Sequence, residues 1–286
     1  MPIIQTEQLT YKYGAGTPFE QTALDHVDLS IEEGEFVGVI GHTGSGKSTL
    51  LQHFNGLLKP GGGRVLIDGK DIWEKGADKR ALRFLVGLVF QYPEYQLFEE
   101  TVYKDIAFGP RNMGLGDAEI DERVHEAADF VGVEPDWLEK SPFALSGGQK
   151  RRVAIAGVLA MRPKVLILDE PAAGLDPRGR ESILARIRDY QRAQGNTVLL
   201  VSHSMEDIAR LATRVLVMDK GKAMLYDTVS ATFARSRELL AMGLDVPQIT
   251  RVFLRLKEMG YPVHDTVYTV EQGKAEILRV LKEAGR

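Results

Sequence analysis

The sequence contains no cysteine among its 286 residues. This absence excludes disulfide bonds, thiolate nucleophiles and thiolate-bound metal sites, and it is compatible with a reducing compartment. Charge is also nearly balanced, because 36 Lys and Arg residues stand against 40 Asp and Glu residues. Composition therefore gives no support for a basic surface that binds nucleic acid. Hydrophobic residues make up 44% of the chain, so we expect one large domain with a real core and a smaller second one.

Long hydrophobic runs are missing as well. The longest apolar stretches are 36–40, 165–168 and 198–201, far short of the roughly 18 residues that a membrane-spanning helix requires. The first residues, MPIIQTEQLTYKY, have neither a basic leader nor a long apolar segment, so nothing indicates secretion. Any membrane role is expected to be peripheral, at the cytoplasmic side of the cell membrane.

Short apolar runs alternate with helical patterns along most of the chain. Several of the runs are continuous rather than alternating, which is typical of strands buried on both faces of a parallel sheet. The pattern predicts an α/β core whose ligands bind beyond the carboxyl ends of the strands. Expected strands cover 3–11, 27–31, 36–40, 86–90, 165–169, 197–201 and 214–219, and a helix is expected over 47–57.

Two regions depart from this alternation. Residues 92–145 contain no convincing buried strand, but Ile120, Val124, Ala127, Ala128 and Val131 form a helical stripe. We interpret 92–160 as a mostly helical insertion into a domain that covers 1–228. The remaining segment, 229–286, carries two amphipathic helical patterns and is expected to be a small accessory or dimerisation domain. Their apolar positions are Ile249, Val252, Phe253, Leu256 and Met259 in one, and Ile277, Val280 and Leu281 in the other.

The segment GHTGSGKS, residues 41–48, fits the pattern G-x-x-x-x-G-K-[ST] and lies between an expected strand and an expected helix. Glycines allow the backbone to wrap around an anion, and the helix directs free N–H groups and its positive dipole end at it. Lys47 adds a charge for the terminal phosphates, and Ser48 offers a hydroxyl ligand to Mg²⁺. The alternative is a glycine-rich turn with no ligand. The predicted nucleotide contacts are Gly41, His42, Thr43, Gly44, Ser45, Gly46, Lys47, Ser48 and Thr49.

A second motif, VLILDEP, ends a buried strand with two carboxylates. Asp169 is expected to hold Mg²⁺, through water, while Glu170 is expected to act on the attacking water as general base. The alternative for Glu170 is an acidic loop residue in solvent. A third motif, LSGGQKRR, opens a helix that is expected to run to Ala160. Ser146 with Gln149 forms a capping box, and this helix N-terminus is a second candidate anion site.

Along the chain the glycine-rich loop is followed by LSGGQ, VLILDE, GLDP (174–177) and VSH (201–203), and this order resembles that of the ATP-binding-cassette ATPases over residues 3–228. The resemblance implies a P-loop NTPase core with a mostly parallel sheet, antiparallel N-terminal strands, a helical insertion and a small C-terminal α-containing domain. It also implies that two cassettes pack head to tail around ATP and Mg²⁺, so that one chain provides two half-sites. The signature residues Ser146, Gly147, Gly148 and Gln149 would then face the ATP held by the partner.

The same resemblance assigns four further residues. Tyr13 would stack on adenine, Gln91 would contact Mg²⁺ and the attacking water, Asp176 would communicate across the dimer, and His203 would contact the γ-phosphate. Three of them have an ordinary alternative. Tyr13 could be a strand aromatic and competes with Tyr11, Gln91 could be a polar residue at a strand end, and His203 could be a histidine whose hydrogen bonds are made within the fold. The family often has Thr in the loop after the catalytic Glu, where this chain has Ala172; no known catalytic group is lost.

A narrower resemblance lies in 90–115, in 141–161 and in the added C-terminal segment, which are similar to the ATPases of energy-coupling factor transporters. In that family two paralogous ATPases sit under a transmembrane coupling subunit, and an exchangeable membrane subunit captures a vitamin or metal ion. This chain is most similar to the second ATPase, so a heterodimer is expected, with no nucleic-acid partner. The aromatic segment 92–98 follows Gln91 and is a candidate docking site for a membrane-protein helix.

Other interpretations remain open at this stage. One is a homodimeric ATPase of a cobalt or nickel importer, and another is a soluble cassette ATPase that acts outside transport. A non-enzymatic nucleotide-gated subunit would be expected to lack a carboxylate at 170 or a sound signature, and this chain has both. The basic run 150–152 is expected to face phosphate or solvent. His42 has no assigned side-chain role, and the transported substrate cannot be read from this chain.

Overall fold

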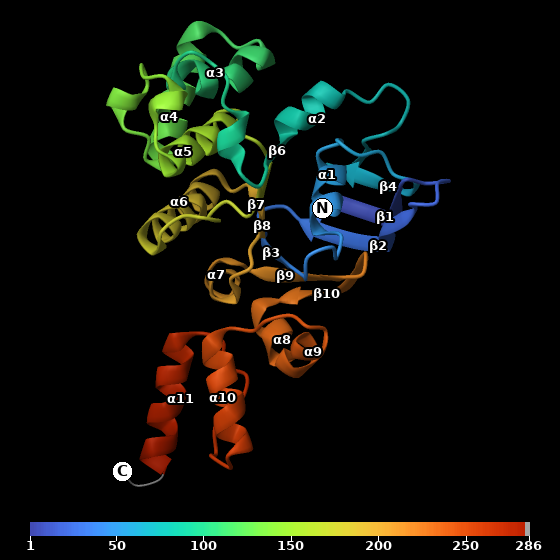
Figure 1. Ribbon diagram of the computed structural model, residues 1–286, viewed down its shortest axis with the longest axis vertical. Helices are drawn as coiled ribbons and strands as arrows, with labels where there is room; N and C mark the ends of the chain where they lie inside the picture. Colours follow the sequence, from blue (N-terminus) through green and yellow to red (C-terminus); the bar gives the residue numbers. More distant parts are fainter. Residues whose placement is uncertain (284–286) are drawn as a thin grey trace.

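The computed structural model of the chain describes residues 1–283, which contain two β-sheets that lie side by side in Figure 1. One is a four-stranded antiparallel sheet in the order β2-β1-β4-β5. Its two N-terminal strands pair with each other, as the sequence predicted. The strands are β1 (Pro2–Tyr13), β2 (Gln21–Glu32), β4 (Gly62–Ile67) and β5 (Lys70–Asp71).

The other sheet has six strands in the order β10-β9-β3-β8-β7-β6. All neighbours in it are parallel except β10, which pairs antiparallel with β9. This arrangement confirms the mostly parallel α/β core. The strands are β3 (Phe36–Ile40), β6 (Val86–Val89), β7 (Val165–Asp169), β8 (Thr197–Val201), β9 (Arg214–Asp219) and β10 (Lys222–Thr228).

Several strands of the parallel sheet are apolar at every position because other layers of the fold cover both of their faces. In β8, Val198 and Leu200 belong to one core cluster, while Leu199 and Val201 belong to another. Side chains alternate between the two faces of a strand, so each face packs against a different layer. One layer consists of helices, and the other consists of α1 (Lys47–Phe54) and the antiparallel sheet. Strand β3, which leads into the glycine-rich loop, is buried along its whole length.

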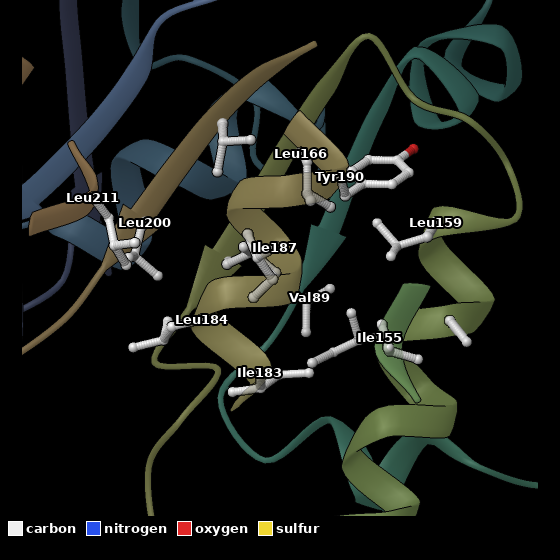
Figure 2. Close-up of a cluster of buried hydrophobic side chains, with 14 of the residues drawn as sticks. Val89, Ile155, Leu159, Leu166, Ile183, Leu184, Ile187, Tyr190, Leu200 and Leu211 are labelled. Atoms are coloured by element: carbon white, nitrogen blue, oxygen red, sulfur yellow. The ribbon is translucent and has the colours of Figure 1, made fainter. Parts of the chain in front are cut away.

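The helical layer packs α5 (Gly147–Leu159) and α6 (Pro177–Gln194) against the parallel sheet. Figure 2 shows one side of α6 directed at the strands and at α5. Helix α7 (Met205–Leu211) is a shorter helix of this core, whereas Leu82 of α2 (Lys79–Leu85) belongs to the core cluster on the other face of the sheet. The side chains that meet in Figure 2 are Val89, Ile155, Leu159, Leu166, Ile183, Leu184, Ile187, Tyr190, Leu200 and Leu211.

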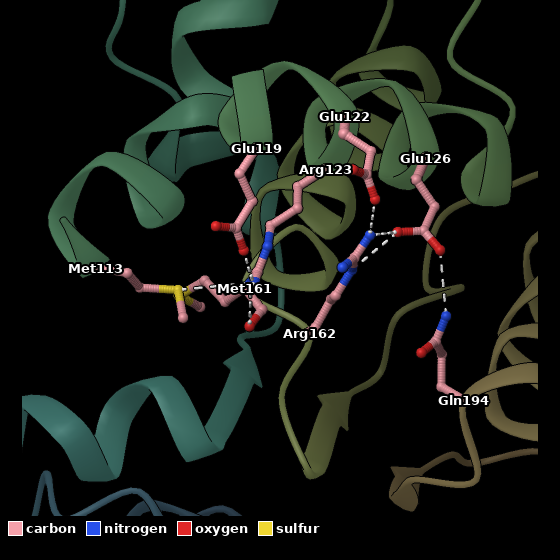
Figure 3. Close-up of polar contacts among 8 residues, drawn as sticks. All are labelled: Met113, Glu119, Glu122, Arg123, Glu126, Met161, Arg162 and Gln194. Carbon is pink, nitrogen blue, oxygen red and sulfur yellow. Dashed lines mark hydrogen bonds and ion pairs between the residues drawn. The ribbon is translucent and has the colours of Figure 1, made fainter. Parts of the chain in front are cut away.

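Between residues 90 and 164, all of which the structure describes, the chain contains helices and no strand. These elements form the separate upper lobe in Figure 1, and all five residues of the predicted stripe are buried. Arg162 ties α4 to the core, since its Nη2 lies 2.8 Å from Glu122 Oε1 and 2.5 Å from Glu126 Oε2 (Figure 3). The elements are η1 (Pro93–Gln96), α3 (Val102–Met113), α4 (Asp117–Val131), η2 (Pro135–Trp137), η3 (Pro142–Ala144) and α5.

The C-terminal segment contains α8 (Val229–Ala234), α9 (Ser236–Ala241), α10 (Gln248–Glu258) and α11 (Val270–Glu283). Side chains of the first two helices join the main helical-side core, whereas Phe253, Val263 and Val267 form a small cluster of their own. Helices α10 and α11 run side by side away from the sheet in Figure 1. The domain division after residue 228 stays a prediction, and residues 284–286 of the predicted second domain lie outside the described residues.

Some elements differ from the sequence prediction. The helix expected over 47–57 ends at Phe54, because Gly56 adopts φ +68 and Asn55 donates a side-chain hydrogen bond to the carbonyl of Val86. Strands β4, β5 and β10 and helix α2 were not predicted. Strand β4 pairs with β1, which is distant in the sequence, whereas β5 and β10 are the second strands of tight hairpins with β4 and β9. Within residues 1–283, no helix combines the length and the apolar character needed to cross a membrane.

Candidate functional site

The glycine-rich loop leaves β3 at Ile40 and enters α1 at Lys47. Two of its glycines are required by close packing. A Cβ at Gly41 would lie 2.4 Å from the carbonyl oxygen of Met218, and a Cβ at Gly46 would lie 2.5 Å from that of Ala23. Gly44 instead has open space around it and a φ of +80, so here the backbone conformation requires glycine.

Lys47 extends back over this loop. Its Nζ donates hydrogen bonds to the carbonyls of Gly41 at 2.6 Å and His42 at 3.0 Å. Burial lowers the pKa of Lys47, while Asp169 and Glu170 act in the opposite direction. The side chain is thus a desolvated cation held next to free backbone amides, an environment in which a phosphate anion is strongly favoured.

Asp169 lies directly opposite the start of α1. Ser48 Oγ donates a hydrogen bond of 2.8 Å to Asp169 Oδ2. A hydroxyl and a carboxylate in contact are a suitable pair of hard oxygen ligands for Mg²⁺, which is usually bound through few protein oxygens plus substrate phosphates. The donor set therefore fits this cation, and both residues were predicted to hold it.

Glu170, the next residue, has an unusual environment. Its φ is +53, a left-handed conformation rarely adopted by a residue other than glycine. The side chain is only 12% exposed, and Oε1 is buried without a hydrogen-bond partner. His203 Nε2 lies 3.4 Å from that oxygen. Burial raises the pKa of Glu170, and the nearby His203 opposes this increase. Strain and an underpaired buried carboxyl are common at functional sites.

A cleft of about 260 Å³ brings these groups together. It is lined by residues 43–49 of the loop and helix, by Gln91, by Asp169 and Glu170, and by His203. These residues follow β3, β6, β7 and β8, four adjacent strands of the parallel sheet. The cleft therefore lies at the carboxyl edge of the sheet, where ligands bind in open α/β folds. Gln91 and His203, which come from distant parts of the sequence, meet the loop here.

The two candidate tyrosines of β1 have different environments. Tyr11 is partly buried, and its ring packs edge-on against His53 with centroids 4.9 Å apart. Tyr13 is exposed, and its hydroxyl lies 3.3 Å from Thr49 Oγ1 at the beginning of α1. Tyr13 is thus the tyrosine with a free face beside the glycine-rich loop. Its contact with adenine stays a prediction.

The LSGGQ segment lies at a different cavity, of about 310 Å³. Ser146 Oγ accepts from the backbone N–H of Gln149, and Gln149 Oε1 accepts from the N–H of Ser146, which confirms the capping box. Gly147 begins α5. Asp176 caps α6 at the same cavity, where it accepts from the N–H groups of Arg178 and Gly179. Residues lining this cavity include Ser146, Gly148, Gln149, Leu175 and Asp176.

Two of the three residues of the basic run after LSGGQ have structural partners that the sequence did not indicate. Arg151 is 4% exposed, so it does not face solvent, and it pairs with Glu94. Both Arg151 and Arg152 line the cavity of the LSGGQ segment, so an orientation toward phosphate stays a prediction. Arg152 donates to the carbonyl of Val131 and to Ser182. Both guanidinium groups are structural ties that use charge-assisted hydrogen bonds. Sequence reasoning missed them, because their partners lie far away along the chain.

His42 also has a side-chain partner that the sequence did not indicate. Its Nε2 lies 2.7 Å from Asp219 Oδ1 at the end of β9, and its Nδ1 lies 2.8 Å from the carbonyl oxygen of Thr43. The Thr43 carbonyl and Asp219 raise the pKa of His42, while burial and Lys47 oppose the increase. The imidazole therefore ties the glycine-rich loop to the neighbouring strand.

The contact between His42 and Asp219 predicts that the stability of the folded protein depends on pH. A raised pKa in the folded state contributes stability below the unfolded value of 6.5, and this contribution disappears as the pH rises through the folded pKa. Because the pair is partly exposed, we expect His42→Gln to lower the thermal midpoint by about 1–2 °C at pH 6 and not at pH 9. Thermal unfolding of both proteins at the two pH values measures this. A difference that is the same at pH 6 and pH 9 contradicts the prediction. Asp219→Asn should reduce the pH dependence without removing it, because the Thr43 carbonyl also raises the pKa of His42.

Comparison with known proteins finds relatives over nearly the whole chain. The sequence model of the ABC transporter family matches residues 24–173. The energy-coupling factor transporter ATP-binding protein EcfA2 of Clostridium tetani is 55% identical, with 97% of this chain and 96% of that protein covered. The protein of the same name from Symbiobacterium thermophilum is 54% identical, over 100% of this chain and 98% of that protein.

Solved structures are similar as well. The protein cbiO1 of Clostridium perfringens, described as part of the ABC transporter complex cbiONQ, is 40% identical, with a TM-score of 0.75. The match covers 91% of this chain and 97% of cbiO1. The ATP-binding cassette MJ0796, solved as a dimer in a post-hydrolysis state with ADP and Pi, is 30% identical, with a TM-score of 0.71. That match covers 79% of this chain and 98% of the cassette.

Proposed function

The chain belongs to the ATP-binding cassette ATPases, among the ATP-binding proteins of energy-coupling factor transporters, and from this premise we propose how it works. It binds and hydrolyses ATP to power uptake of a micronutrient such as a vitamin. It works as the second of two paralogous ATPase subunits, bound to the cytoplasmic face of the cell membrane. The proposal rests on the site geometry described above and on these relatives.

In the proposed site, the loop from Gly41 to Ser48 holds the triphosphate with backbone amides and Lys47. Tyr13 stacks on the adenine. Ser48 and Asp169 would hold Mg²⁺, with Gln91 as a further ligand, and the cation would neutralise phosphate charge when bound. Glu170 accepts a proton from the attacking water and orients it. His203, whose Nε2 lies 3.4 Å from Glu170 Oε1, contacts the γ-phosphate.

One observation carries the proposal that two chains are needed: the LSGGQ segment and the glycine-rich loop of this chain line separate cavities. Ser146, Gly148 and Asp176 are therefore available to a nucleotide that belongs to a second ATPase. ATP bound between the two chains then stabilises the closed dimer. Shifting a dimer from 1:99 to 99:1 closed requires about 5.5 kcal/mol of differential binding, or roughly half of that from each of two sites.

The surface for the membrane subunits is proposed on the segment that follows Gln91. Tyr92, Tyr95 and Phe98 are exposed, whereas Leu97 is buried and anchors the segment. Phe108 of α3 extends this surface, because its ring packs edge-on against Phe98. Exposed aromatic residues gathered in one place are typical of an interaction site. The partners proposed here are a transmembrane coupling subunit and, through it, an exchangeable substrate-binding membrane subunit.

Helices α10 and α11 support a role of the C-terminal segment in association of the two ATPases. Both leave apolar side chains in solvent, which on a small helical pair indicates contact with another surface. These side chains are Val252, Met259, Ile277, Leu278 and Leu281.

Purification from membranes tests the proposal. We expect the tagged chain to copurify with a distinct second ATPase and with two kinds of membrane protein, each identified by mass spectrometry. Substituting Asp for both Tyr95 and Phe98 should remove the membrane proteins and leave the second ATPase. Phe19→Asp is the control, since Phe19 is also an exposed aromatic residue but lies in the loop between β1 and β2.

Three results would contradict parts of this proposal. A chain that is recovered alone would remove the support for transport and favour a soluble cassette ATPase. Copurification of membrane proteins with no second ATPase would indicate a homodimer, as in the alternative of a cobalt or nickel importer. Loss of the membrane proteins with Phe19→Asp, and not with the double substitution, would place the docking surface elsewhere.

A further inference from the structure

Arg151 is a buried charged residue that none of the proposed steps uses, although it contacts two loops of the nucleotide site. We propose that Arg151 is a positioning residue that couples the chain's own nucleotide cleft to the signature segment it presents to the second ATPase. The inference rests on the proposed function, because it assumes that the signature completes the partner's site. It assigns a role to one guanidinium, its partner Glu94 and the carbonyl of Ala173.

The guanidinium uses all of its nitrogen atoms in these contacts. Its Nε lies 3.2 Å from Glu94 Oε2 and its Nη2 lies 2.9 Å from Glu94 Oε1, a bidentate ion pair. Its Nη1 donates to the carbonyl of Ala173. The side chains of Arg151 and Glu94 are 5% and 16% exposed. The planar guanidinium forms several hydrogen bonds in fixed directions, so it holds both partners in place more tightly than a lysine ammonium would.

Both partners lie one short turn away from residues proposed to handle the attacking water. Glu94 follows Gln91 by three residues, in a turn closed by a 3.2 Å hydrogen bond from the N–H of Tyr95 to the carbonyl of Tyr92. Ala173 follows Glu170 by three residues, and its N–H donates to the Glu170 carbonyl at 3.1 Å. A displacement of either loop by the bound nucleotide therefore reaches the guanidinium within one turn.

On its other side, Arg151 belongs to the helix that begins at the signature. Ser146 is the N-cap of α5, and Arg151 lies in the second turn of this helix. A helix transmits displacement along its axis as a nearly rigid body, and a buried ion pair resists separation because each charge loses its only counterion. The position of Ser146 is thereby linked to the loops that carry Gln91 and Glu170. One side chain connects the two half-sites of a single chain.

Another arginine of the same chain offers a matched control. Arg123 also binds one carboxylate and one backbone carbonyl: Nη2 lies 2.7 Å from Glu119 Oε1, and Nη1 donates to Met161 at 3.3 Å (Figure 3). Its side chain is 13% exposed. These contacts join α4 to the end of α5 and touch neither loop of the nucleotide cleft. Removing Arg123 therefore reproduces the loss of structural contacts without the proposed coupling.

The first test compares Arg151→Gln with Arg123→Gln in the complex with its partner subunits. We expect Arg151→Gln to lower kcat at least tenfold while the Kd and KM for ATP stay within about twofold of the unchanged protein. Arg151→Lys should not restore turnover, since an ammonium cannot form the bidentate pair and the carbonyl contact together. Arg123→Gln should lower the thermal midpoint to a similar extent and leave kcat within about twofold. Glu94→Gln keeps the shape of the side chain and should lower kcat to the same extent as Arg151→Gln. It replaces Arg151→Gln as the test variant if Arg151→Gln does not fold.

The second test measures the coupling directly by hydrogen–deuterium exchange. The full chain is kept at a concentration where only monomers are present, and a non-hydrolysable ATP analogue is added with Mg²⁺. In the unchanged chain we expect slower exchange at 41–49 and a changed rate at 146–151. In Arg151→Gln the protection of 41–49 should remain, while the response of 146–151 should fall at least threefold.

These measurements separate the inference from the proposed function. No protection at 41–49 in the unchanged chain would contradict nucleotide binding itself. Protection at 41–49 with the same response at 146–151 in both proteins would overturn the coupling role alone. An equal loss of kcat in Arg151→Gln and Arg123→Gln would also overturn it, because both residues would then act only through stability.

Discussion

Glu170→Gln is expected to lower ATP turnover by at least about a hundredfold, since general-base catalysis typically contributes a factor of about 10² to 10⁴. The substitution keeps the size of the side chain and removes its ability to accept a proton. Affinity for ATP should stay within about threefold, because the contacts of the triphosphate lie in the loop from Gly41 to Ser48. Turnover is measured by phosphate release, and affinity is measured by equilibrium binding. Glu181→Gln, an exposed carboxyl on α6, is the control and should change neither quantity.

The same variant should accumulate the closed dimer. With hydrolysis blocked, the γ-phosphate keeps bridging the loop of one chain and the signature of the other, so the equilibrium stays on the closed side. Size-exclusion chromatography with light scattering should show an ATP-dependent complex of this variant with the second ATPase. Association that does not depend on ATP would contradict the clamp, and full turnover by Glu170→Gln would exclude Glu170 as the base.

Ser146→Asp is expected to abolish most turnover without weakening ATP binding to this chain's own loop. Asp is as good an N-cap as Ser, so α5 should begin normally. Its negative charge, however, would face the triphosphate held by the second ATPase and repel it in a site with little water. We expect kcat to fall at least about a hundredfold and the Kd for ATP, measured on the isolated chain, to change less than twofold.

Ser146→Asn is the matched control for the charge. Asn is also a strong N-cap but is neutral, so its turnover should be at least ten times that of Ser146→Asp. Equal turnover in the two variants would show that charge at this position does not matter. Full turnover by Ser146→Asp as an isolated monomer would contradict the division of each site between two chains.

Much of the site could be predicted because its motifs are local. The loop from Gly41 to Ser48 lies within one strand–turn–helix unit, and its glycine spacing reflects backbone constraints that act over a few residues. The capping box of Ser146 and Gln149 is local for the same reason. Strands such as 165–169 and 197–201 could be placed because burial on both faces leaves a continuous apolar run. A strand stabilised by a distant partner, such as β4 paired with β1, carried no such signal.

The sequence by itself determined the chemical groups: a phosphate-binding loop, two adjacent carboxylates after a buried strand, and a capped helix with a glycine-rich N-terminus. Only the tertiary structure decided which groups meet. The order of strands β3, β8, β7 and β6 places Gln91, Glu170 and His203 in one cleft and leaves Ser146 at another. It also selected Tyr13 over Tyr11 as the exposed tyrosine beside α1, and it buried Arg151 against Glu94. Local spacing dictates backbone conformation over a few residues, whereas strand order and burial depend on packing between segments that are far apart in the chain.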